Sequence, residues 1–402
     1  MALKVKISLI GALDMLKFKN MAADREKAIQ AAPAREIKAD FPINNNAKAL
    51  HPDYLDLVVK EVVDHPEADA KSFILARAEG GPLPYFRAGQ YISLKLPIGG
   101  SFLSRPYSIS SGPKWALDGM YAVTVKANPG GFAADWMLDN LKAGDKITAS
   151  GPLGDFYYDK YRDCRHVLAL AGGSSITPFL SMAYAIQDGV EDFDMTILYG
   201  SATADTIMLR KELEEIAAAC PKVKVVHVLS DEEKEGFEHG FITADLIRKY
   251  APAEEYSVFI CGPEAMYRFV GREIEKLGLP RRLVRPEMLG VTKEVWKQPG
   301  YPAEAKDKVF RLTVKQGPEE YGIDAAAGEP LLVAMERAGV KAPSRCRSGQ
   351  CGWCRSRLLS GRVYAPEEND GRRWADKEYG YVHPCATFPL SDITLEVPGE
   401  YL

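Results

Sequence analysis

Four cysteines in the C-terminal part of this 402-residue chain have the spacing of ligands for an inorganic centre. They form a C-x4-C-x2-C run with one distant fourth member: Cys346, Cys351, Cys354 and Cys385. This is the plant-type pattern in which four thiolates hold a 2Fe-2S cluster. Gly349 and Gly352 allow the backbone to wrap around a small core. Structural zinc also accepts four cysteines, but usually as two short pairs, so the spacing favours the cluster over zinc.

The sequence around these cysteines is similar to a known electron-transfer domain. The runs CRSGQCGWC, RLLSGRV and HPCATFP resemble the C-terminal ferredoxin domain of ring-hydroxylating and related oxygenase reductases. A strand-like stretch at 309–315, a helix-like stretch at 329–338 and a strand-like stretch at 393–397 frame the cysteine loop. This order resembles the β-grasp fold of ferredoxins, and the resemblance implies an electron-transfer function.

A second motif, Arg105-Pro106-Tyr107-Ser108, follows the run Phe86 to Tyr91. The two resemble the flavin-binding barrel of the ferredoxin-reductase superfamily, and the resemblance extends over residues 54–290. The planar guanidinium of Arg105 suits a flavin phosphate. The resemblance implies that Tyr107 lies against the isoalloxazine. It also implies that Ser108 hydrogen-bonds near the flavin N5 that accepts hydride, which makes Ser108 a candidate catalytic residue.

A pair of glycines opens an expected helix downstream and supplies a candidate pyrophosphate site: Gly130, Gly131, Phe132 and Ala133. Glycines at a helix start leave backbone N–H groups free to bind an anion, although the same pair is also compatible with a hairpin turn. The superfamily commonly has serine or threonine where this chain has Ala134, which removes one hydroxyl contact. This loss weakens the preference for FAD over FMN, so we expect FAD with FMN as the alternative.

Two turns mark an expected nicotinamide site. The first lies in the run AGGSSITPF and contributes Gly172, Gly173, Ser174, Thr177 and Pro178. The second is Cys261-Gly262-Pro263. Each follows a hydrophobic stretch and precedes a helix, and the first has the geometry that places a pyrophosphate at a helix N-terminus. Both resemble nicotinamide-binding signatures of the superfamily, with Ser175 in place of the usual third glycine. The resemblance implies that Cys261 lies where the nicotinamide meets the flavin, so Cys261 is the second candidate catalytic residue.

The choice between NADH and NADPH depends on the residues after the stretch 195–199. A 2'-phosphate requires a nearby arginine or lysine. Asp205 and the lack of an adjacent cation favour NADH. Arg210 and Lys211 on the following helix keep NADPH open.

The elements that position these motifs indicate a multidomain protein. Short alternating stretches at 56–62, 91–96 and 121–127 indicate a small antiparallel barrel. Hydrophobic stretches at 166–171 and 256–260 alternate with helical ones and indicate a parallel sheet flanked by helices. The predicted division is 1–52 N-terminal extension, 53–157 flavin-binding barrel, 158–290 NAD(P)H-binding domain, 291–306 linker and 307–402 ferredoxin domain with an α+β fold.

The extension and the linker carry no motif for chemistry. We expect a helix at 14–31 and a turn-rich stretch at 42–46, and both packing on the body and partner docking are open for this region. The linker contains Pro299 and Pro302, which should limit the motion of the ferredoxin domain.

Composition narrows the class of protein. Hydrophobic residues make up 46% and charged residues 26%, as in soluble globular proteins. A net charge of -4 gives no basic field for nucleic acid. No apolar run approaches the ~20 residues of a membrane span. The apolar stretch 7–13 is too short for a signal peptide, and no small-residue cleavage site of the usual kind follows it. Cysteines outside the cluster pattern suit a reducing cytoplasm: Cys164, Cys220 and Cys261.

Cations surround the cysteine loop, with no acidic residue between 337 and 365: Lys341, Arg345, Arg347, Arg355 and Arg357. They are suited to offsetting the negative cluster or contacting the flavin domain. Alternatively, Arg355 and Arg357 form a docking surface for an acidic electron acceptor.

Together these motifs predict an NAD(P)H-dependent iron-sulfur flavoprotein reductase. Flavin is required because nicotinamide moves two electrons together, whereas the cluster takes one. We expect the acceptor to be a protein component of a hydroxylase or oxygenase. A reductase for a quinone or an anaerobic redox partner, and a redox-sensing module, are the alternatives.

Overall fold

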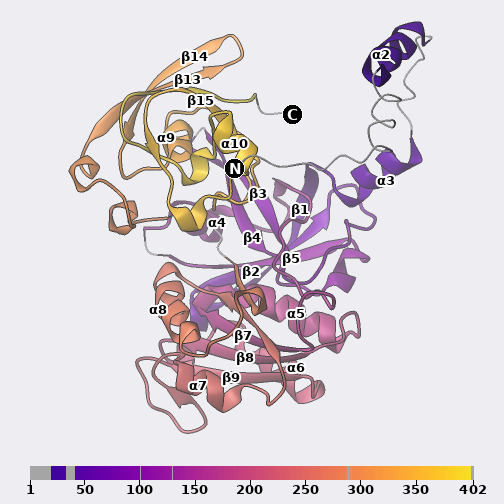
Figure 1. Cartoon of the computed structure of the whole chain (residues 1–402). Helices are drawn as coiled ribbons and strands as arrows, with labels where there is room; N and C mark the ends of the chain where they lie inside the picture. Colours follow the sequence, from indigo (N-terminus) through magenta and orange to yellow (C-terminus); the bar gives the residue numbers. More distant parts are fainter. Residues whose placement is uncertain are drawn as a thin grey trace, which may run out of the picture. The chain divides into compact units, whose positions relative to one another are not determined.

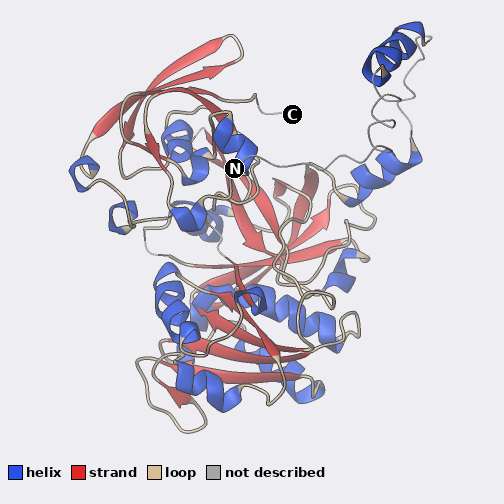
Figure 2. Ribbon diagram, in the orientation of Figure 1, coloured by secondary structure: helices blue, strands red, loops and turns tan. Residues whose placement is uncertain are grey.

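The computed structural model of the chain describes residues 20–32, 41–99, 101–128, 130–287, 290 and 292–399. The chain divides into two compact units, Met1–Ala47 and Lys48–Leu402. Helix α2 (Met21–Ala31) belongs to the first unit, and α3 (Pro42–Leu50) crosses the boundary. All of the described sheets lie in the second unit (Figure 1) and account for most of its regular structure (Figure 2).

The N-terminal region differs from expectation at one place. Helix α2 covers the later part of the expected helix, and residues 14–19 lie outside the described residues. The expected turn at 42–46 is wrong, because these residues begin helix α3. Pro42 fixes a helix-compatible φ at the first position, where its missing N–H costs nothing. The amides of Asn44 and Asn45 both donate to the carbonyl of Phe41, which completes the first turn.

The next region is an antiparallel barrel. Its strands are β1 (Leu55–His65), β2 (Ala70–Arg77), β3 (Tyr91–Ile98), β4 (Ser101–Ser108), β5 (Met120–Lys126) and β6 (Lys146–Ala149), in the order β4-β3-β6-β1-β2-β5. A bridge between Ile109 and Val123 joins the end of β4 to β5 and closes the sheet. Alternate residues such as Leu57 and Val59 fill the interior. Helix α4 (Phe132–Asn140) packs against β3 and β5.

A parallel sheet follows. Its strands are β7 (His166–Gly172), β8 (Asp194–Ser201), β9 (Val223–Leu229), β10 (Glu238–His239), β11 (Tyr256–Cys261) and β12 (Val284–Glu287). The flanking helices are α5 (Thr177–Gln187), α6 (Arg210–Ala219), α7 (Ala244–Tyr250) and α8 (Glu264–Glu275). The strand order β10-β9-β8-β7-β11-β12 reverses between β7 and β11. Ligands bind at such a switch point, beyond the carboxyl ends of the strands.

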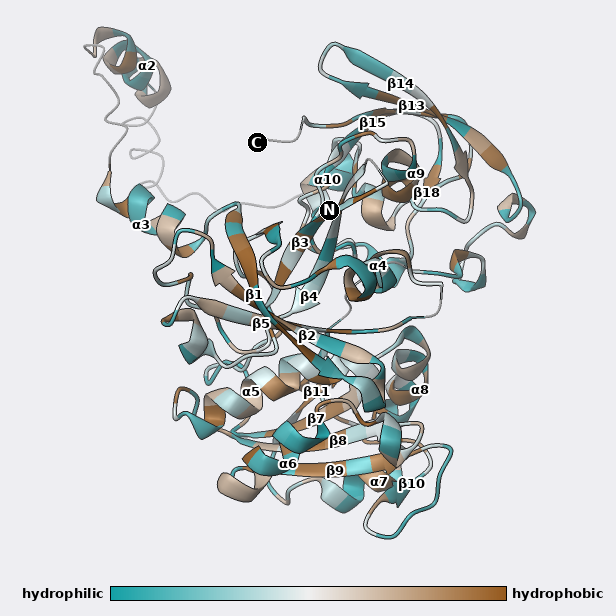
Figure 3. Ribbon diagram, turned by 180° about the vertical axis from the view of Figure 1, so that it is seen from behind, coloured by the Kyte–Doolittle hydropathy of each residue, from teal (hydrophilic) through white to brown (hydrophobic). Residues whose placement is uncertain are grey.

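Both faces of the parallel sheet are buried, which explains its continuous hydrophobic stretches. On β7, Val167 and Ala169 join the core beneath α5 and α6, whereas Leu168 and Leu170 join the core beneath α7 and α8. This alternation follows from the two-residue period of a strand. Figure 3 shows the hydrophobic residues along β7 and β9 in brown.

The barrel and the parallel sheet share part of one core. The ring of Phe156, which follows the barrel, lies 5.6 Å from the ring of Phe179 on α5 and 5.3 Å from that of Phe259 on β11. The hydroxyl of Ser181 on α5 donates to the carbonyl of Ser111 at 2.7 Å. These buried contacts fix the two domains against each other.

The C-terminal region contains a mixed sheet. Its strands are β13 (Val309–Gln316), β14 (Glu319–Ala326), β15 (Ser356–Ser360), β17 (Tyr381–Val382) and β19 (Ile393–Glu396), in the order β14-β13-β19-β15-β17. Strands β16 (Val363–Tyr364) and β18 (Phe388–Pro389) form a separate pair, and the helices are α9 (Leu331–Arg337) and α10 (Trp374–Glu378). Strands β13 and β19 pair in parallel, and the other pairs are antiparallel. This arrangement is the expected ferredoxin-like fold.

The segment before β13 is packed rather than extended. Its side chains Val295, Tyr301 and Ala305 are buried in a small core with Phe388 of the ferredoxin domain. Short 3-10 turns at Val295–Lys297 and Ala303–Ala305 hold it in shape.

A glycine at the contact between the barrel and the parallel-sheet domain provides a stability test. Gly89 has φ of 104°, and an added Cβ would lie 2.0 Å from the carbonyl oxygen of Phe156. We expect Gly89→Ala to lower the free energy of unfolding by more than about 2 kcal/mol, because backbone strain and steric overlap both act. Urea denaturation followed by tryptophan fluorescence measures this change.

Gly144→Ala is the matched control. Gly144 has φ of 94° but no atom within 4 Å of an added Cβ, so only backbone strain remains. We expect a loss of roughly 1 kcal/mol. Equal losses in the two variants would show that the contact at Gly89 contributes nothing.

Candidate electron-transfer site

The four candidate cluster ligands meet in one place. Three lie on the loop between α9 and β15, called here the cluster loop (residues 345–354), and Cys385 lies on the turn Pro384–Ala386. The sulfurs of Cys354 and Cys385 are 3.4 Å apart. The thiol of Cys346 contacts those of Cys351 and Cys385. Cys351 is exposed, and the other three are buried.

The backbone of the cluster loop favours thiolates. The amides of Ser348 and Cys351 donate to the sulfur of Cys346 at 3.5 and 3.4 Å, and the amide of Trp353 donates to Cys351 at 3.5 Å. Hydrogen bonds to its sulfur hold the pKa of Cys346 well below its usual range, and the bond from the Cys351 thiol contributes most. In the described part of the chain no three His, Cys, Asp or Glu side chains are arranged for a single metal ion. Four sulfurs linked by successive contacts, with amide donors beside them, fit a 2Fe-2S cluster.

Glycine is required where the cluster loop turns most tightly. Gly349 has φ of 81°, and an added Cβ would lie 2.0 Å from the carbonyl oxygen of Asn369. The Nδ1 of His383 donates to the carbonyl of Gly349 at 2.6 Å. The loop is therefore held from two sides, as the sequence pattern requires.

The two predicted nicotinamide turns are neighbours. Ala171 on β7 pairs in register with Cys261 on β11, so the turns after these strands lie together at the switch point. An added Cβ on Gly172 would lie 2.5 Å from the sulfur of Met266 and 3.0 Å from Cδ of Pro263. The close approach of the turns explains why a glycine occupies this position.

The remaining residues of the first turn form the helix start. Gly173 has φ of 54° and begins the 3-10 turn Gly173–Ile176, which contains Ser174. Thr177 and Pro178 are the first residues of α5 and are buried. Proline at this position supports the helix N-terminus that the motif predicted.

Cys261 is buried and uncharged. Burial raises the pKa of its thiol to about 12, and the carboxyl of Glu287 adds to the rise. The side chains of Ser175 and Tyr267 lie within hydrogen-bonding reach of the thiol. The Tyr267 hydroxyl also accepts from the amide of Gly262 at 3.3 Å and donates to the carbonyl of Glu287. Tyr267 thus ties the Cys261 turn to the end of β12.

A pocket of about 580 Å³ opens beside these turns and is called here the nucleotide pocket. Gly172, Gly173 and Pro263 line it together with Ser201 and Ser230. Lys126 is the one positively charged side chain among the described residues that line this pocket.

The two cations that left NADPH as an alternative, Arg210 and Lys211, do not line the nucleotide pocket. Arg210 and Lys211 form i,i+4 ion pairs with Glu214 and Glu215, at 2.7 and 3.9 Å. Asp205 lines a separate hollow together with Arg210, so it is not brought to the nucleotide pocket.

The candidate flavin residues of the RPYS motif lie on β4. Arg105, Tyr107 and Ser108 pair with Leu94, Ile92 and Tyr91 of β3, and Pro106 pairs with Ser93. Burial raises the pKa of Tyr107 to about 12 against a smaller lowering by Arg105, so its ring is neutral. Ser108 is buried at the end of the strand. The motif thus presents one cation, one neutral ring and one hydroxyl along a single strand.

The candidate pyrophosphate residues lie at the start of α4. Gly130 has φ of 78°, and an added Cβ on Gly131 would lie 2.6 Å from the carbonyl oxygen of Asn128. Gly131 is the N-cap of α4, and no side chain caps this described helix start. Phe132 is exposed and Ala133 is buried. The first amides of α4 are available to an anion.

A pocket of about 520 Å³, called here the central pocket, joins the three domains. It is bordered by Tyr91 of the barrel, Glu287 at the end of β12, and Cys346 and Cys351 of the cluster loop. Burial raises the pKa of Glu287 to about 8, and the Cys346 thiolate and Asp155 add to the rise. Because Glu287 also acts on Cys261, one buried carboxyl lies near both the nicotinamide turn and the cluster.

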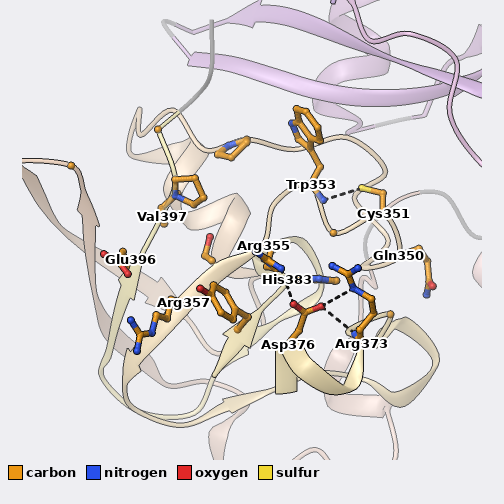
Figure 4. Close-up of a pocket in the computed structure, with 18 residues that line it drawn as sticks. Gln350, Cys351, Trp353, Arg355, Arg357, Arg373, Asp376, His383, Glu396 and Val397 are labelled. Carbon is orange, nitrogen blue, oxygen red and sulfur yellow. Dashed lines mark hydrogen bonds and ion pairs between the residues drawn. The ribbon is translucent and has the colours of Figure 1, made fainter. Parts of the chain in front are cut away.

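A hollow of about 900 Å³, called here the outer hollow, also borders the cluster loop (Figure 4). Cys351 lines both this hollow and the central pocket. In Figure 4, Arg355 and Arg373 both reach Asp376, at 3.0 and 3.5 Å. Arg357 lies on the same wall and is exposed.

Besides Arg355, two further cations around the cysteines form ion pairs with acidic side chains of the chain. Arg345 pairs with Asp53 at 3.2 Å, and Arg347 pairs with Glu336 at 2.5 Å; both arginines are buried. The expectation that part of this charge contacts the flavin domain therefore holds for Arg345, and for Arg347 through the carbonyl of Ser104 on β4.

Three domain families match the chain. The oxidoreductase FAD-binding domain matches residues 55–158, the oxidoreductase NAD-binding domain 169–272, and the 2Fe-2S iron-sulfur cluster binding domain 314–390. Their order agrees with the three folds described above. The chain is therefore an oxidoreductase that binds FAD, NAD(H) and a 2Fe-2S cluster.

Several relatives of the chain are named as reductase components of oxygenase systems. It is 28% identical over 342 residues to the glycine betaine monooxygenase reductase subunit of Chromohalobacter salexigens, covering 82% of this chain and 91% of that protein. It is 29% identical to the ferredoxin reductase component of 3-ketosteroid-9-alpha-monooxygenase of Mycobacterium tuberculosis, covering 84% and 94%.

A solved structure agrees in fold. Phthalate dioxygenase reductase superposes with a TM-score of 0.62 at 24% identity, over 86% of this chain and 98% of that one. The chain thus shares the fold of that protein, with an FAD-binding domain, an NAD-binding domain and a 2Fe-2S domain in one chain. None of the helices in the described residues combines the length and apolar character needed to cross a bilayer.

Three residues of this site were not found by sequence reasoning. Glu287, Tyr267 and Glu336 lie in no motif that the sequence made recognisable. Tyr267 directly follows the run CGPEAM, and this position next to the motif is the signal that could have identified it. Glu287 and Glu336 become significant only through contacts with residues far along the chain.

The cluster assignment is tested by removing one ligand. We expect Cys385→Ala to abolish the visible absorbance and electron paramagnetic resonance signal of the 2Fe-2S cluster while FAD content stays unchanged. The reason is that Cys385 packs in the ferredoxin core, separate from the barrel core. Cys220→Ala, in the parallel-sheet domain, should keep both cofactors. Retention of a full cluster signal in Cys385→Ala would contradict the ligand set.

Proposed function

We propose that the chain is the reductase component of a multicomponent oxygenase or hydroxylase, and that it delivers electrons from NADH to a protein partner. The names of the relatives support this, because each describes a reductase component of an oxygenase system. The chain also spans most of their length. The partner is therefore proposed to be the terminal oxygenase component.

The central pocket is the observation that carries this proposal. A barrel residue, Tyr91, the end of the NAD-binding domain at Glu287, and two cluster cysteines border the same 520 Å³ space. An isoalloxazine bound there would lie between the cluster loop and the end of β12, which Tyr267 connects to the Cys261 turn. We infer that this space holds the flavin ring.

The predicted flavin residues and Cys261 receive roles in this proposal. FAD, when bound, supplies the conversion of a two-electron hydride into single electrons. Arg105 is proposed to bind its phosphate, with the free amides after Gly131 binding the pyrophosphate. Tyr107 offers a neutral ring for packing against the flavin, and Ser108 offers a hydroxyl. Cys261 fills the contact between nicotinamide and flavin with an uncharged thiol, which avoids placing a negative charge beside the hydride.

The nucleotide pocket supports NADH over NADPH. Its lining near the end of β8 consists of small neutral residues such as Ser201 and Ala202. A 2'-phosphate binds best to arginine, and Arg210 is engaged by Glu214. Asp205 does not contribute to this preference for NADH, because it lines a different hollow.

The acceptor is proposed to dock at the outer hollow. The exposed ligand Cys351 borders this hollow, so it offers a short route for an electron to leave the protein. Arg355, Arg357 and Arg373 supply positive charge on its walls, only part of which Asp376 and Glu396 balance. Such a surface suits an acidic partner.

An anoxic titration with NADH tests the electron-transfer function. We expect uptake of about three electrons per chain, two by FAD and one by the cluster. Flavin bleaching in the visible spectrum and a reduced 2Fe-2S signal in electron paramagnetic resonance measure the two steps. Bleaching of flavin with an unreduced cluster would contradict the proposal.

The docking surface is tested with acceptors of opposite charge. We expect the double variant Arg355→Gln, Arg357→Gln to reduce an acidic haem protein, cytochrome b5, roughly threefold to tenfold more slowly at low salt and with a flatter salt dependence. Reduction of FAD by NADH and turnover with ferricyanide should not change.

Basic cytochrome c and Arg362→Gln are the controls. Arg362 is exposed but lines a different hollow, so its loss should leave cytochrome b5 reduction unchanged. Cytochrome c should not be slowed by the double variant. Unchanged cytochrome b5 kinetics in the double variant would exclude docking at these arginines.

A further inference from the structure

Three charged side chains from two domains meet at the contact between the barrel and the ferredoxin domain. Arg347 of the cluster loop forms two hydrogen bonds with Glu336 on α9, at 2.5 and 3.0 Å. Arg105 on β4 lies 3.7 Å from the same carboxylate. The side chains of Arg347, Glu336 and Arg105 are only 3%, 7% and 22% exposed. They are called here the Arg105-Glu336-Arg347 triad.

The triad is anchored to the barrel through backbone groups. Arg105 and Arg347 both donate to the carbonyl of Ser104 on β4, at 2.9 and 3.4 Å. The hydroxyl of Ser101 donates to the carbonyl of Glu336 at 2.9 Å. The ferredoxin domain therefore docks on the same strand that carries the proposed phosphate ligand Arg105.

The charges of the triad do not balance. Two guanidinium groups face one carboxylate, which leaves one largely buried positive charge. Burial and the neighbouring Arg347 lower the pKa of Arg105 to about 10, although Glu336 acts against this lowering. Leaving a buried charge without a partner is costly, so the site is suited to one further anion.

We propose that the flavin phosphate is this anion, and that its binding and the docking of the ferredoxin domain favour each other. The proposal rests on the role of Arg105 proposed above. Because such coupling is reciprocal, the phosphate binds more tightly when Glu336 and Arg347 are in place, and the cluster loop is held more firmly when flavin is bound. Flavin loading thereby prepares the path from flavin to cluster.

A second ion pair across the same interface provides a matched comparison. Arg345 pairs with Asp53 at 3.2 Å, and its carbonyl accepts from the hydroxyl of Ser93 at 2.9 Å. The Asp53 side chain is 72% exposed, and this pair shares no described contact with Arg105. Asp53→Asn therefore weakens the interface without changing the charge of the triad.

Hydrogen-deuterium exchange of the flavin-stripped full chain tests the coupling. FMN and riboflavin are added at saturation, since they differ only in the phosphate. We expect FMN to slow hydrogen-deuterium exchange in α9 at least about fivefold more than riboflavin does. About fivefold is the lower end of the usual coupling between two binding sites. This difference should disappear in Arg105→Gln and persist in Asp53→Asn.

Binding affinities measure the reverse direction. The ratio of the riboflavin Kd to the FMN Kd should fall about fivefold or more in Arg347→Gln, which removes one positive charge. Arg347→Lys keeps the charge, so its ratio of the riboflavin Kd to the FMN Kd should stay close to that of the original protein. This variant also controls for a general folding defect.

The outcomes separate this inference from the proposed flavin site. FMN that binds more tightly than riboflavin, yet protects α9 no better, would overturn the coupling and leave the phosphate at Arg105 intact. FMN that binds no more tightly than riboflavin to the original protein would overturn the role of Arg105 itself, and the coupling with it.

Discussion

The docking of the cluster loop on the edge of the barrel is the constraint on which the other features depend. Single electrons move between flavin and cluster only if the two are close, so the domain that holds the cluster cannot be free to move away. The structure meets this need with contacts to backbone carbonyls, from Ser93 to Arg345 and from Ser101 to Glu336. The packed segment before β13 adds a second restraint, through Val295 and Tyr301.

The fold brings the nicotinamide to the same place by a different principle. In the parallel sheet, the strand order reverses between β7 and β11, so the turns at Gly172 and Cys261 meet at one edge. Strand β12 then carries Glu287 from this edge to the central pocket. Tyr267 connects the two positions through hydrogen bonds to Gly262 and Glu287. The barrel, the end of the NAD-binding domain and the cluster loop thereby border one space.

Local patterns allowed much of this arrangement to be predicted from the sequence. The cysteine spacing, the hydrophobic stretches of the parallel sheet and the glycine turns are set by neighbouring residues, and the corresponding strands and turns lie where expected. The turn predicted at 42–46 failed because proline and asparagine are common in turns, whereas Pro42 here starts a helix. The residue-by-residue cofactor contacts and the domain boundaries stay predictions.

Long-range contacts could not be predicted in this way. Arg347 looked like one of several cations around the cluster, but it pairs with Glu336 and reaches a barrel strand. Nothing near Glu336 in the sequence indicates Arg105 as a neighbour. Asp205 was expected near the nucleotide from its position after β8, but the chain turns it into a different hollow. Such pairings arise only when domains pack.

The central claim is that electrons pass from flavin to cluster within one chain, across the barrel and ferredoxin contact. The most direct test is anoxic stopped-flow mixing with NADH, with flavin absorbance and freeze-quenched electron paramagnetic resonance followed over a wide range of protein concentration. The account predicts that flavin bleaches first and that the cluster is then reduced at a rate independent of protein concentration. A cluster reduction rate that rises in proportion to protein concentration would show transfer between molecules and contradict it.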